Sequence, residues 1–96
     1  MIEVFKKQGI DIEKIILFGS RARGDCRSGS DWDILIITKE NIKRDKYLEV
    51  YGNIIKRLRL LNIKVDMVII DKEYFRKTKN VINTISYEAL QEGITI

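Results

Sequence analysis

The chain has 96 residues, enough for one small domain with a single hydrophobic core. Hydrophobic residues make up 45% and charged residues 33% of the sequence, which is typical of a globular protein and excludes an intrinsically disordered chain. The net charge is +4, and the basic residues are spread along the sequence. Most of them are therefore expected to be solvated surface groups, and direct binding of nucleic acid is not expected.

Residues 1–96 are expected to form one domain, because no proline-rich or low-complexity segment marks a boundary. The apolar runs are too short to span a membrane, and the N-terminus lacks the pattern of a signal peptide. Cys26 is the only cysteine, which excludes an internal disulfide and favours a reducing compartment. We therefore expect a cytoplasmic protein.

The first half of the chain is predicted to contain one helix and two strands. Apolar residues among polar ones predict a short helix over 2–8. The isoleucine-rich segment 14–18 predicts a buried strand, and 31–38 predicts a second strand that enters the core. Between the strands, the polar stretch 19–30 contains three glycines, and a helical turn is expected to begin at Ser20.

The second half is predicted to contain a long helix over 42–61, where apolar residues recur on one helical face. A third strand over 64–70 is indicated by its β-branched residues, and Asp71 is expected to cap the turn that follows. A last helix over 78–92 and a short strand over 94–96 complete the chain. Four residues of that last helix are expected to face inward: Val81, Ile82, Ile85 and Ala89.

This alternation of helices and strands favours an α/β (α+β) fold in which helices pack on one face of a small mixed β-sheet. The other face of the sheet is then expected to be available for a functional site.

Gly19 and Ser20 lie where a buried strand meets the predicted start of a helix. Unpaired backbone N–H groups and the positive end of the helix dipole favour an anion at such a point. The glycine lets a phosphate approach the backbone closely, and the serine adds a hydroxyl donor. Taken alone, this pair is more often a turn with an N-cap.

Three aspartates are candidates for binding metal. Asp31 and Asp33 lie two apart on a predicted strand, so both carboxylates point from the same face and repel each other unless a cation compensates. Such a pair is by itself more often two solvated residues at a strand end. Asp66 lies in an otherwise apolar strand segment, where an unpaired acid is costly to bury.

If the two strands are neighbours, the three carboxylates converge on one patch suited to two magnesium ions about 4 Å apart. A salt bridge from Asp66 to a lysine or arginine is the alternative, and we favour the metal site.

The segments Gly19-Ser20-Arg21-Ala22-Arg23-Gly24 and Ser30-Asp31-Trp32-Asp33-Ile34, with a later acid on a neighbouring strand, resemble the signature of the DNA polymerase β-like nucleotidyltransferase superfamily. Within it, the chain looks like the minimal nucleotidyltransferase (MNT) group, which includes MntA-like antitoxins paired with HEPN-domain toxins. The resemblance covers nearly the whole chain. Ile34 stands where leucine is commoner, a conservative difference.

The resemblance implies a nucleotidyltransferase fold and an enzyme that uses ATP and two Mg²⁺ ions. Gly19 and Ser20 would hold the triphosphate, Asp31 and Asp33 would bind both metal ions, and Asp66 would bind the catalytic metal and help deprotonate the acceptor. The other residues assigned to the nucleotide are Arg21, Arg23 and Ser30. For the two arginines, an ion pair with Asp25 or another acid is an equal alternative.

The resemblance also implies the acceptor and the partner. In the antitoxin group, AMP passes to a tyrosine hydroxyl of the HEPN toxin, which forms a complex with the antitoxin and loses its RNase activity. No acceptor domain fits within the predicted elements, so we expect the acceptor on a separate macromolecule. The alternatives are an antitoxin that neutralises its partner by binding alone, and a transferase acting on RNA or on a small molecule such as an aminoglycoside.

Overall fold

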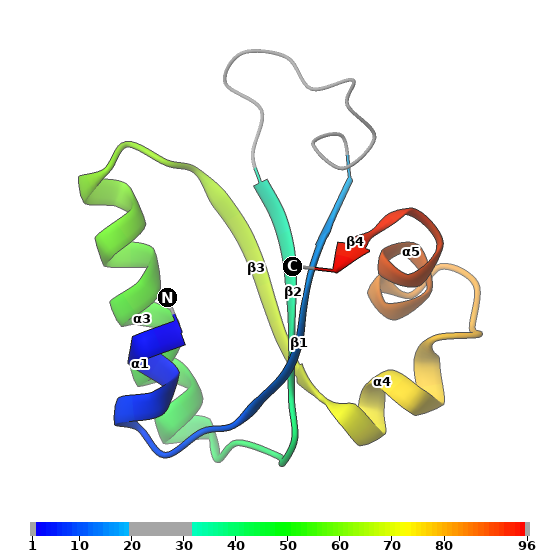
Figure 1. Ribbon diagram of the computed structural model, residues 1–96, viewed down its shortest axis with the longest axis horizontal. Coiled ribbons are helices and arrows are strands. Elements are labelled where there is room, and N and C mark those ends of the chain that lie inside the picture. Colours follow the sequence, from blue (N-terminus) through cyan, green and yellow to red (C-terminus); the bar gives the residue numbers. More distant parts are fainter. Residues whose placement is uncertain (1, 20–31, 96) are drawn as a thin grey trace.

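The computed structural model describes residues 2–19 and 32–95 (Figure 1). Alternating helices and strands form in the predicted order. Their bounds are α1 Ile2–Lys7, β1 Ile12–Phe18, β2 Trp32–Thr38, α3 Arg44–Leu60, β3 Val65–Asp71, α4 Lys72–Thr78, α5 Ile85–Glu92 and β4 Ile94–Thr95. None of the helices in these two ranges is long and apolar enough to cross a membrane.

The sheet is mixed and has the strand order β3-β2-β1-β4, as the fold class predicted. β1 pairs antiparallel with β2 and with β4, whereas β2 and β3 are parallel. A parallel pair needs a crossover connection, and α3 supplies it between β2 and β3. β2 and β3 therefore begin at the same end of the sheet (Figure 1).

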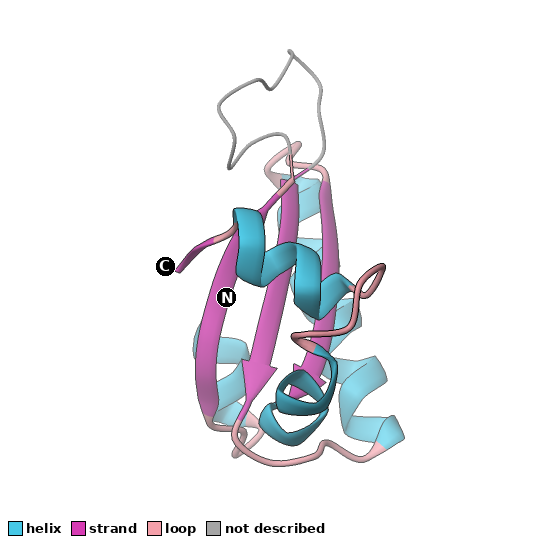
Figure 2. Cartoon of the chain, turned by 90° about the vertical axis from the view of Figure 1, so that its right-hand side faces the viewer, coloured by secondary structure: helices cyan, strands magenta, loops and turns pink. Residues whose placement is uncertain are grey.

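Helices cover both faces of the sheet, so the prediction that they pack on one face is wrong (Figure 1). One apolar cluster joins α1 and α3 to the sheet through Phe5, Val50 and Ile36, among others. A second cluster, with Leu35 and Ala89, lies on the opposite face under α4 and α5. Figure 2 shows α4 and α5 lying across this second face. The physical reason is that the central strands are apolar on both faces, which requires a cover on each.

The last helix is shorter than predicted, because it begins at Ile85 and not at residue 78. Residues 79–84 form turns, with Asn83 at a φ of 75°. Val81, Ile82 and Ile85 are 50%, 68% and 41% exposed, so the expectation that they face inward is wrong, whereas it is confirmed for Ala89, which is buried. The predicted cap at Asp71 is confirmed, since its Oδ1 accepts a hydrogen bond of 2.9 Å from the backbone N–H of Tyr74.

Candidate active site

Asp33 and Asp66 lie opposite each other in the parallel register of β2 and β3. Residues in register project from the same face of a sheet. Two residues further along each strand, Leu35 and Val68 belong to the apolar cluster on the α5 side. The two carboxylates therefore point toward the α5 face, at the end of the sheet where both strands begin.

Gly19 lies directly beside Asp33. It follows β1 with a φ of +76°, a conformation that favours glycine. A Cβ atom at this position would overlap Oδ2 of Asp33. Phe18, the last residue of β1, is paired with Asp33 across the sheet. The end of β1 and the beginning of β2 thus bring the backbone of Gly19 against a carboxylate.

Gly19, Asp33 and Asp66 line one cavity of about 270 Å³. The structure therefore brings together the three predicted site residues that it describes. The other predicted residues, Ser20, Arg21, Arg23, Ser30 and Asp31, lie outside the described residues. Apolar walls come from Phe18, Val68 and Ile85.

Asp66 is exposed, so the expectation that an apolar strand buries it is wrong. β3 is an edge strand of the sheet, and its first residues reach the solvent at the end of α3. Asp33 is half-buried. What places Asp66 in the site is its register with Asp33, and not the cost of burying an isolated acid.

Two further acids, Glu88 and Glu92, line the same cavity from α5 and were missed by the sequence analysis. They lie four residues apart and so share one side of the helix. No local pattern in the sequence places them at the site, because their contact with the cavity depends on α5 packing on this face of the sheet. Their charge adds to that of Asp33 and Asp66, which favours a cation at this end of the sheet.

The donor set fits magnesium held together with a nucleotide. Within residues 2–19 and 32–95, no three histidine, cysteine or acidic side chains are arranged to hold a metal ion by themselves. Magnesium commonly takes one or two carboxylates and completes its shell with substrate phosphates and water. Asp33 and Asp66 supply two such carboxylates on one face, and Asp31 precedes Asp33 by two residues in the sequence.

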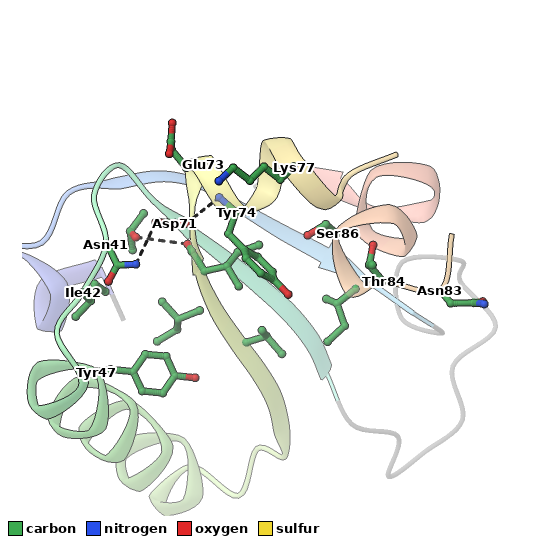
Figure 3. A pocket seen from close by; sticks show the side chains of 15 residues that line it. Asn41, Ile42, Tyr47, Asp71, Glu73, Tyr74, Lys77, Asn83, Thr84 and Ser86 are labelled. Carbon is green, nitrogen blue, oxygen red and sulfur yellow. Dashed lines mark hydrogen bonds between the residues drawn. The ribbon is translucent and has the colours of Figure 1, made fainter. Parts of the chain in front are cut away.

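A larger cavity of about 680 Å³ lies toward the opposite end of β3 (Figure 3). Its acid at the strand end, Asp71, already accepts hydrogen bonds from the Tyr74 backbone and from the Asn41 side chain. Tyr47 and Lys77 also line it, but none of the predicted site residues does. This cavity therefore lacks the acidic pair and the glycine that the smaller one combines.

The mixed sheet, the glycine after β1 and the paired aspartates define a protein of the nucleotidyltransferase class. The family described as polymerase beta, nucleotidyltransferase (Polbeta) matches residues 1–96. The chain therefore belongs to this family. No curated protein matches the sequence significantly.

Solved structures share the fold. A chain of a toxin–antitoxin crystal structure with AMP-PNP is 21% identical, with a TM-score of 0.62 over 98% of this chain and 67% of that one. A candidate nucleotidyltransferase from Sulfolobus solfataricus is 23% identical, with a TM-score of 0.61 over 98% and 69% of the two chains. A chain of the complex between the tri-AMPylated Shewanella oneidensis HEPN toxin and its MNT antitoxin is 17% identical, with a TM-score of 0.55 over 98% and 63%.

Proposed function

We propose that this chain is a magnesium-dependent protein adenylylyltransferase, an antitoxin that transfers AMP from ATP to a tyrosine hydroxyl of a HEPN RNase toxin and so neutralises it. The observation that carries the proposal is the register of Asp33 and Asp66 beside Gly19 in one cavity. Family membership supports nucleotidyl transfer. The similar fold of the MNT antitoxin complex with an AMPylated HEPN toxin supports the choice of partner.

The family resemblance and the positions of Gly19, Asp33 and Asp66 support the roles of the residues. The N–H groups at Gly19 and Ser20 would hold phosphate oxygens, and Asp31, Asp33 and Asp66 would hold two magnesium ions. Bound magnesium supplies charge stabilisation at the transferring phosphate. Arg21, Arg23 and Ser30 are assigned to the same nucleotide, since they lie in the segment that joins Gly19 to β2.

The reaction is an in-line displacement at the α-phosphorus of ATP. The tyrosine oxygen forms a bond to that phosphorus while the bond to the bridging oxygen of the β-phosphate breaks, and pyrophosphate leaves. The hydroxyl proton passes to the carboxylate of Asp66, which is exposed and therefore accessible to an acceptor that arrives from outside the chain.

Transfer of labelled AMP to a co-purified HEPN toxin tests the proposal. With α-labelled ATP and magnesium, we expect label on a toxin tyrosine and loss of its RNase activity. Asp33→Asn removes a proposed metal ligand and is expected to reduce the transfer rate by at least about 100-fold. The matched control is Asp45→Asn, which removes an exposed acid from the first turn of α3, away from the cavity.

Two other outcomes of these assays would support the alternative functions. If Asp31→Asn and Asp33→Asn neutralise the toxin as well as the wild type and no label is transferred, the protein is an antitoxin that acts by binding alone. Strong pyrophosphate release with an aminoglycoside or RNA, and none with the toxin, would show that this molecule is the acceptor.

A further inference from the structure

The outer surface of α3 contains a hollow formed by that helix alone. Its lining residues come from two rows with a spacing of four residues, and such rows are the ridges that helices use in packing. One row is Tyr51, Ile55 and Arg59, and the other is Gly52, Lys56 and Leu60. The groove between two such rows has the shape that receives a ridge of another helix.

Gly52 deepens this groove. A Cβ atom added there would meet nothing within 4 Å, so no described part of the chain packs against this position. Glycine is disfavoured in the middle of a helix, and here no fold contact requires it. Leu48 and Leu60 lie four residues before and eight residues after Gly52 in the same row and are 57% and 81% exposed. A small residue between exposed leucines is the surface expected of a helix that lacks its packing partner.

The charge around the groove selects the partner. Between Glu49 and Asp66, the sequence contains no acidic residue and four exposed basic ones: Lys56, Arg57, Arg59 and Lys64. A second copy of this chain would bring the same basic groups together, which is repulsive. A helix with acidic residues on both sides of an apolar ridge is complementary to the groove in shape and in charge.

The exposed apolar groups favour a protein over single-stranded RNA. Leucines lie between the basic residues, and leucine is a common residue of apolar contacts but offers no aromatic face to a base. Tyr51 is the aromatic residue that lines the groove, and its ring already stacks on that of Tyr47, with centroids 6.0 Å apart. One face of the ring is therefore occupied and not available to a base.

We propose that this groove on α3 docks an acidic amphipathic helix of the protein that is adenylylated. The C-terminal end of α3 leads into β3 at the end of the sheet where Asp33 and Asp66 lie (Figure 1). α3 covers the face opposite to the one toward which the two carboxylates point, so a helix seated on α3 leaves the cavity open to another segment of the same partner. The role of that helix as part of the acceptor rests on the proposed function, whereas its docking does not require catalysis.

The test uses a fluorescent helical peptide of about 18 residues, with leucines along one ridge and glutamates on both sides, as a probe of the wild-type protein. We expect salt-sensitive binding by anisotropy, with NMR amide shifts concentrated over residues 48–60. The same peptide with lysines in place of glutamates is expected to bind at least about tenfold more weakly. The double variant Lys56→Glu with Arg59→Glu is expected to bind the lysine peptide more tightly than the glutamate peptide. The matched control is Lys43→Glu with Arg44→Glu at the other end of the helix, which should keep the preference for the glutamate peptide.

Gly52→Leu fills the groove and is expected to abolish binding without lowering the melting temperature, because the position is open. Asn53→Leu adds the same side chain at the neighbouring exposed position and should leave binding unchanged. No binding of the glutamate peptide, or shifts away from α3, overturns the proposal. Binding of a single-stranded RNA, but not of the peptide, to α3 also overturns it. Asp33→Asn separates the two proposals, since it should stop transfer of AMP and leave peptide binding intact.

Discussion

Gly19 and Asp33 restrict each other at the candidate site. The glycine has a φ of +76°, and a side chain there would overlap the Asp33 carboxylate. Position 19 favours glycine for two reasons. Its φ lies in the left-handed region, and the Asp33 carboxylate lies against its backbone. Gly19 therefore affects both the local backbone conformation and the position of Asp33. A comparison with a glycine that has only the conformational role separates the two effects.

Gly19→Ala is expected to destabilise the fold by about 1–2 kcal/mol, the cost of a left-handed conformation for a residue with a side chain. It should also displace the Asp33 carboxylate and abolish AMP transfer. Gly9→Ala is the matched control, since Gly9 has a φ of +71° and nothing within 4 Å of an added Cβ. Urea unfolding should show similar losses for the two variants, with transfer lost only in Gly19→Ala. Equal transfer rates in both variants would contradict a role for Gly19 at the site.

The sequence was sufficient to predict that Asp33 and Asp66 meet on the condition that their strands are neighbours, and the parallel pairing of β2 and β3 meets that condition. It was not sufficient for Glu88 and Glu92. These acids reach the cavity only because α5 packs on the face that was expected to be open. A contact between distant elements depends on which face each helix covers, and local patterns do not determine that choice.

At the scale of elements, the break before α5 shows how a side-chain hydrogen bond overrides helical periodicity. The hydroxyl of Thr84 accepts from the Tyr87 backbone N–H at 3.1 Å and caps the helix. Its other contacts are to the carbonyl oxygens of Thr78 and Val81, each at 2.8 Å. A threonine that bonds to these backbone groups favours a turn. The predicted continuous helix over 78–92 therefore does not form, and turns separate α4 from α5.

Thr84→Ala is expected to destabilise the protein by about 1 kcal/mol, because it removes the N-cap of α5. Thr84→Ser keeps the hydroxyl and should retain most of the stability. Urea unfolding measures both, and circular dichroism reports the helix content. A gain of helicity in Thr84→Ala would show that the threonine prevents a continuous helix, whereas unchanged stability and unchanged helicity would contradict its role as the cap. The AMP transfer rate should fall as well, since α5 carries the glutamates that line the cavity.

At the scale of the whole molecule, the class of fold could be predicted, but the arrangement of its layers could not. Alternating elements imply a mixed sheet, and the structure has one. The run Ile34, Leu35, Ile36, Ile37 is buried throughout, which means that both faces of β2 are covered. This apolar run was visible in the sequence, but the amphipathic helices that follow do not specify their face. The result is a site bordered by a helix on a face expected to be open.

Magnesium and ATP together are expected to stabilise the whole fold, because they bind the native arrangement of Asp33 and Asp66 and relieve the repulsion between these acids. At a ligand concentration of about ten times Kd, the gain is about 1.4 kcal/mol, which raises Tm by roughly 5–10 °C in a domain of this size. Differential scanning fluorimetry measures this shift. Asp33→Asn with Asp66→Asn should lose the shift that magnesium and ATP produce in the wild type, because both proposed metal ligands are removed. A shift that persists in this double variant would place magnesium and nucleotide away from the two strands, and an unchanged Tm of the wild type would count against the site itself.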